Sequence, residues 1–272
     1  MTLAEAAARL QFAAIGTLKQ RQKDRLAAKH QPKIAAFFRS QKRQVLAALS
    51  QEKYLFTESY RQLSEEITQL TLQNWDRIWD KIASDSLPDL QKVVFNAEAE
   101  GVIQGAEQLK KVLPFNAKST FNLANPRAVK WFTDKGGSVD YIKGINSTTA
   151  DSLKRVISTA LDEGWSYQST AREIQKLYDG PISRARAQRI AVFETGQAYE
   201  KGNELFARSL EDDGVTMEES WQTSKDSKVR PEHTANEAEG WVPLGHVFNS
   251  GDSEPPTDPG CRCYKIWRQA PK

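Results

Sequence analysis

The sequence contains very little cysteine and no long apolar segment. Cys261 and Cys263 are the only two cysteines among 272 residues, too few for a disulfide framework in a chain of this size. No run of about 18 apolar residues occurs. The start of the chain also lacks a basic stretch followed by a sustained apolar core. We therefore expect no membrane span, no export signal and synthesis in a reducing compartment.

Several motifs that carry common enzyme chemistry are also missing. The sequence has no glycine-rich phosphate loop, no nucleophile elbow and no HExxH helix. These absences argue against an enzyme. A metal-dependent hydrolase or toxin-type domain centred on Glu194, Asp226 and His233, with Arg230 nearby, stays open as an alternative.

Charge is distributed unevenly along the chain. Residues 1 to 50 carry ten Lys or Arg against two acidic residues, a local charge of +8 in a chain whose net charge is only +3. Residues 211 to 260 carry twelve Asp or Glu against three basic residues, a local charge of −9. The basic end can meet a polyanion, and the acidic end repels one. The basic segment is either a solvated helix face or a contact for nucleic acid or an acidic partner, with these candidates: Arg21, Lys23, Arg25, Lys29, Lys33, Arg39, Lys42 and Arg43.

The front of the chain has helical periodicity. Ile34, Phe38 and Val45 share one face of a helix, and similar faces recur as far as residue 113. Pro32 and the stretch 86–90, SLPDL, predict corners, because proline ends a helix more readily than it continues one. We expect an extended helical arm over 1–113, a linker with a short helix over 114–146, and a separate domain over 147–272. Deleting residues 1–113 is then expected to leave a folded remainder.

The predicted C-terminal domain opens with three helices. The first begins at Thr148 and stops at Gly164, and the second is capped by Ser166 or Ser169 and ends before Pro181. The third runs from about residue 183 to 210. Its inner stripe is mostly small, as at Ala198 and Gly202, so we expect another backbone to approach it closely.

Glu194 interrupts that stripe of small and apolar residues. A carboxylate at such a position loses several kcal/mol of hydration unless it finds a partner or keeps its proton. We predict that Glu194 is buried and pairs with Arg230 or His233. A structural role in a polar core network is the more common explanation for such a residue than catalysis.

After Gly214 the pattern indicates short strands and loops. We predict a strand around Trp221, a hairpin over 240–248 and a closing strand in CRCYKIW. Side chains alternate along a strand, so Cys261 and Cys263 are expected on one face, turned toward Asp226 and His233. The fold class is therefore α+β: an extended helical region followed by a compact domain of helices and a small antiparallel sheet.

Three explanations of the Cys-x-Cys pair stay open. A disulfide would close a very small, strained ring. Two thiolates could instead hold half of a structural zinc site, completed by His233 and either Asp226 or His246. Two reduced thiols could also simply pack in the core. In each case the predicted structural cluster is the same: Glu194, Asp226, Arg230, His233, Cys261 and Cys263.

Three segments, in order and spacing, resemble the head morphogenesis domain of the phage Mu F-like minor head proteins. They are SRARAQRIAVFETGQAYEKG, WQTSKDSKVRPEHTANEAEGWVPLG and PPTDPGCRCYKIW, and the resemblance covers about residues 130–267. The family often has Arg-Thr-Glu where this chain has Val192, Phe193 and Glu194, and Asn where it has Glu200.

This resemblance implies a virion component of a tailed phage or prophage. Such proteins bind the portal protein at the portal vertex inside the head, after assembly in the host cytoplasm. They act in head morphogenesis, DNA packaging or DNA ejection, with DNA and other head proteins as further partners. The helical front is then the arm that attaches the protein to its assembly. A plain DNA-binding protein that uses the basic front is a second alternative.

Overall fold

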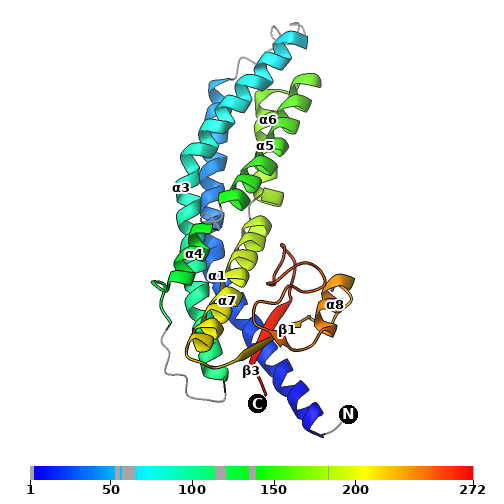
Figure 1. Ribbon diagram of the computed structural model, residues 1–272. Helices are drawn as coiled ribbons and strands as arrows, with labels where there is room; N and C mark the ends of the chain where they lie inside the picture. The colour runs from blue at the N-terminus through cyan, green and yellow to red at the C-terminus, as the bar shows by residue number, and fades with distance from the viewer. Residues whose placement is uncertain are drawn as a thin grey trace. The chain divides into compact units, whose positions relative to one another are not determined.

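The structure is a computed structural model that describes residues 3–52, 56, 65–113, 121–134, 139–182 and 184–271. It is mostly helical with a small three-stranded antiparallel sheet, which confirms the predicted α+β class (Figure 1). The helices are α1 (Leu3–Gln51), α3 (Glu65–Val112), α4 (Pro126–Asp134), α5 (Val139–Asp162), α6 (Tyr167–Leu177), the π-helical turn η3 (Tyr178–Ile182), α7 (Arg184–Asp212) and α8 (Pro231–Ala238). The strands are β1 (Met217–Gln222), β2 (Val242–Pro243) and β3 (Tyr264–Gln269).

Neither predicted corner in the helical front is a corner. Pro32 lies inside α1 and Pro88 lies inside α3. A proline removes one backbone hydrogen bond from a helix. Fully buried side chains follow each proline, Ile34 in α1 and Leu90 in α3, and their packing holds the helix together across the missing bond.

Contacts between residues divide the chain into two compact units. The first unit comprises Met1–His30, Asn96–Asp134 and Arg189–Lys272, and the second comprises Gln31–Phe95 and Lys135–Gln188. This division differs from the predicted boundaries after residues 113 and 146. The reason is that α1 and α3 are long enough to contribute to both units, a long-range arrangement that local sequence patterns do not reveal.

Close contact between α3 and α7 forms the centre of the first unit. A Cβ atom added at Gly105 would overlap the carbonyl oxygen of Tyr199, and one added at Gly202 would overlap the carbonyl oxygen of Val102. The small stripe predicted on the third helix therefore lies against another backbone, as expected. Apolar side chains extend this contact toward the sheet, among them Leu109, Phe206, Met217 and Trp267.

The second unit contains the first two of the three helices predicted to open the C-terminal domain. The first of these, α5, begins at Val139, so Thr148 is an interior residue and donates from its hydroxyl to the carbonyl of Gly144 at 2.6 Å. Of the two predicted caps, Ser166 is the one that caps α6, since its side chain accepts a hydrogen bond from the backbone N–H of Ser169. The apolar face of α5, including Leu153 and Ile157, is buried.

The sheet has the strand order β2-β1-β3, and both pairings are antiparallel. Glu219 in the central strand faces Val242 on one side and Trp267 on the other. The hairpin predicted over 240–248 is wrong, because β2 pairs with β1 instead. The last strand begins at Tyr264, so Cys261 and Cys263 lie in the segment before it. Among the described helices, none combines the length and apolar character that crossing a membrane requires.

Candidate metal centre

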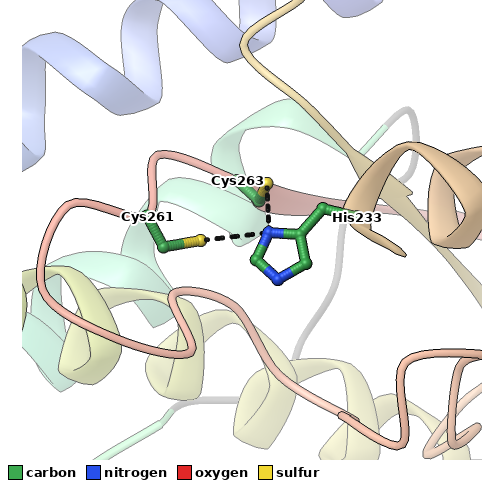
Figure 2. A group of neighbouring side chains, drawn as sticks. All are labelled: His233, Cys261 and Cys263. Carbon is green, nitrogen blue, oxygen red and sulfur yellow. Dashed lines mark hydrogen bonds between the residues drawn. The ribbon is translucent and has the colours of Figure 1, made fainter. Parts of the chain in front are cut away.

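His233, Cys261 and Cys263 come together in the first unit. His233 Nδ1 lies 3.7 Å from Cys261 Sγ and 3.5 Å from Cys263 Sγ (Figure 2). All three potential ligand atoms lie within 4.8 Å of one another, the one such group of His, Cys, Asp or Glu side chains in the part of the chain that the structure describes. Both cysteines are free thiols. The structure thus brings together three of the six residues of the predicted cluster.

Local structure explains how His233 reaches the thiols. α8 starts with Pro231 directly after Arg230, which has an extended backbone at the N-cap position. This start directs His233 inward, where it is buried with its ring centroid 5.4 Å from that of Trp221 in β1. Cys263 packs into the same cluster as Trp221 and Phe248. The site thus has one apolar wall that belongs to the core.

The two thiols have opposite pKa shifts. The pKa of Cys261 is lowered to about 5, first because Cys263 donates a hydrogen bond to its sulfur. The pKa of Cys263 is raised, first because its thiol proton is held in the hydrogen bond to Cys261, and second because burial disfavours its charged form. The two shifts share one cause, the hydrogen bond between the sulfurs, and belong to the pair rather than to either cysteine alone.

Neither residue predicted as the fourth ligand, Asp226 or His246, belongs to this group. Asp226 accepts two hydrogen bonds from Arg262, at 2.6 and 2.8 Å, and these hold its pKa at about 2. His246 Nε2 lies 2.7 Å from the Glu239 carboxylate. Each side chain is held by a charged partner outside the group, which corrects the expectation that Asp226 or His246 completes the site. Asp226 binds the side chain of Arg262, the residue that separates the two cysteines in the sequence.

Glu194 and Arg230 lie apart from the metal group. Glu194 is 0% exposed, so its predicted burial is confirmed. Arg230 donates to Asp258 at 2.7 Å and is exposed, and His233 lies against the two thiols. The pairing of Glu194 with either of them stays a prediction. The described residues do not assemble the enzyme centre considered for Glu194, Asp226 and His233, since only His233 belongs to the group.

The basic residues of the front have three different environments. Lys23 is buried against Glu200, whereas Lys29 binds Glu100 and Lys42 binds Asp179. The other candidates are exposed: Arg21, Arg25, Lys33, Arg39 and Arg43. In the second unit, Arg39 and Lys42 line a pocket of about 380 Å³ whose other lining residues are Gln31, Pro32, Ala35, Phe38, Tyr178, Asp179 and Arg184.

Sequence reasoning missed a buried group of ion pairs in the first unit. Lys19 is 1% exposed, and its Nζ lies 3.1 Å from Glu200 and 2.7 Å from the carbonyl oxygen of Lys265. Lys265 in turn binds Glu219 at 2.8 Å. Burial lowers the pKa of Lys19 to about 8, against the opposing attraction of Glu200. The available signal was the spacing of Lys19 and Lys23, four residues apart on one helix face, together with the departure from the family pattern at Glu200.

Comparison with known families gives one match. Residues 151–266 match the model of the family described as phage Mu protein F like protein, a segment that includes α7, β1, β2, the start of β3 and all three residues of the candidate metal centre. Comparison with curated proteins and with solved structures gave no match. The family is a structural head-morphogenesis family, which agrees with the missing enzyme motifs. On this evidence residues 151–266, less than half of the chain, resemble the phage Mu protein F-like family, and this likeness relates the chain to the proteins of phage heads.

Proposed function

We propose that the chain is a minor head protein of a tailed phage or prophage, bound to the portal protein at the portal vertex. There it acts in head morphogenesis, DNA packaging or DNA ejection. The family match over residues 151–266 is the observation that carries this proposal. The helices α1 and α3 are compatible with it, because they add 49 and 48 residues of helix outside the matched segment, with exposed basic residues on α1.

The structure changes how the attachment role of the front can be tested. Residues 1–113 include Lys19, Gly101 and Gly105, all of which contact α7 in the first unit. Removing them would expose the core of that unit, so the truncated remainder is no longer expected to fold. The test therefore needs the full chain.

We expect the tagged full-length protein to be present in purified particles in a few copies, at a single vertex. Immunogold labelling of particles and co-purification with the portal protein after capsid disruption would measure this. The major capsid protein, labelled in the same way, is the control for an even distribution. A protein that is missing from particles, or spread evenly over the capsid, would contradict the proposal.

A pocket in the second unit favours a direct contact with nucleic acid as part of this function. Three cations, on Arg39, Lys42 and Arg184, line it, against the single carboxylate of Asp179. Among the described residues, the buried hydroxyl of Tyr178 has no hydrogen-bond partner. Such a lining suits a nucleotide: the cations can bind its phosphate group, and apolar side chains such as Phe38 can contact its base.

Replacing Arg39 and Arg184 by alanine is expected to weaken binding of single-stranded DNA. The slope of the logarithm of affinity against the logarithm of salt concentration should become shallower by about 0.7 for each cation removed, because fewer counterions are released from the single strand. Fluorescence anisotropy with a labelled oligonucleotide at several salt concentrations measures both effects. Lys92→Ala, an exposed change on α3 in the same unit, is the control. If the double variant binds DNA as Lys92→Ala does, the pocket is not a DNA contact.

A further inference from the structure

We propose that His233, Cys261 and Cys263 bind one zinc ion, with a water molecule as the fourth ligand. The ion fastens the C-terminal strand β3 to α8. Neither the family match nor the proposed function assigns a metal to this chain, and the inference does not depend on attachment to a portal.

The distances agree with tetrahedral coordination. Zinc binds cysteine sulfur at about 2.3 Å and histidine nitrogen at about 2.0 to 2.1 Å, which places a nitrogen and a sulfur ligand about 3.6 Å apart. The two observed separations from His233 Nδ1 are 3.5 and 3.7 Å. Nitrogen and thiolate sulfur are also the ligands that zinc prefers over the harder divalent cations.

Hydrogen bonding alone accounts poorly for the same arrangement. A neutral imidazole offers one acceptor nitrogen with a single lone pair in the ring plane. Both sulfurs lie around the same nitrogen, Nδ1, so the ring can form a well-aligned hydrogen bond with only one of them, whichever tautomer it adopts. A metal ion among the three atoms satisfies all of them at once.

The surroundings of the ligands suit a bound cation. His233 Nε2 lies 3.5 Å from the hydroxyl of Thr257, an outer partner that orients the ring with Nδ1 toward the thiols. Two arginines lie nearby, but each is paired with a carboxylate: Arg230 with Asp258 and Arg262 with Asp226. Their charges are therefore compensated, and the two thiolates supply the negative charge that the ion needs.

The fourth position opens to a small pocket. Its volume is about 60 Å³, and it is lined by the three ligands together with Ser224, Lys228, Val229, Arg230, Gly260 and Arg262. One water molecule occupies about 30 Å³ in the liquid, so this space admits a water ligand. Asp226 and His246 are held elsewhere and do not fill the position. A site with one exchangeable ligand should release its ion to a strong chelator.

The first test is the metal content of the full-length chain, purified without chelator from zinc-supplemented cultures. Elemental analysis should find about one zinc per chain in the wild type and a loss of most of it in Cys261→Ser and His233→Ala. The matched controls Asp226→Asn and His246→Ala should keep about one zinc. Zinc lost in either control as fully as in Cys261→Ser would overturn the three-ligand site.

A second measurement keeps the proposal testable if the ligand variants fold poorly. The wild-type chain, stripped with chelator and titrated with Co²⁺, should develop thiolate-to-metal absorption that saturates at one equivalent, and zinc should then displace the cobalt. The wild-type melting temperature should fall on chelation and recover when zinc is added. Metal content near zero together with no cobalt absorption would overturn the proposal and leave two packed thiols.

Discussion

Replacing Gly202 by alanine is expected to lower the free energy of unfolding by about 3 kcal/mol or more, at the upper end for overpacked sites. The added Cβ would overlap the carbonyl oxygen of Val102, and a helix backbone cannot move aside as a flexible side chain can. Gly105→Ala meets the backbone of Tyr199 in the same way and should cost a similar amount. Urea unfolding followed by circular dichroism would measure both losses.

Gly144→Ala is the matched control for these substitutions. Gly144 also lies inside a helix, α5, but has no heavy atom within 4 Å of the position of an added Cβ. Alanine should stabilise that helix by roughly 0.5 to 1 kcal/mol, because glycine loses more backbone freedom on folding. If Gly202→Ala is as stable as Gly144→Ala, the close contact between α3 and α7 is wrong.

Replacing Glu200 by alanine is expected to cost about 3 to 5 kcal/mol, the usual loss when one partner of a buried ion pair is removed. Lys19 and Lys23 would then be left buried side by side without the carboxylate that both of them contact. Lys19 also donates to the carbonyl oxygen of Lys265, so the loss should loosen α1 from β3. Proteolysis near residue 19 and the melting temperature would report this loosening.

Two further variants separate a buried ion pair from a general effect of removing charge. Changing Glu200, Lys19 and Lys23 together to apolar residues of similar volume should restore much of the stability, since no uncompensated charge stays buried. Asp76→Asn removes the exposed partner of Lys154 and should change stability little. A Glu200→Ala loss as small as that of Asp76→Asn would mean that solvent reaches the Lys19 and Lys23 amines.

Local signals in the sequence determined much of the secondary structure. The apolar face that includes Ile34 and Phe38 is buried, Ser166 caps α6, and the small residues of α7 face another backbone. These features depend on residues within one or two helical turns of each other, so periodicity and capping rules are sufficient to predict them. Cys261 and Cys263 were predicted to share a strand face, but both precede β3, so strand alternation does not explain why both thiols lie near His233.

Tertiary structure alone decided the features that depend on residues far apart in the chain. Pro32 and Pro88 lie inside helices because the burial of neighbouring side chains outweighs the local preference of proline to end a helix. The partners of Glu200 lie at positions 19 and 23, and no local pattern marks such a distant pairing. Asp226 resembled a metal ligand in the sequence, but the fold places Arg262 beside it and a carboxylate held by a guanidinium is no longer free to bind a metal. The sequence alone thus predicted most of the helices and the types of side chain that could bind a metal. Which of these side chains lie together was decided in the tertiary structure, because partners far apart in the chain compete for the same charged groups.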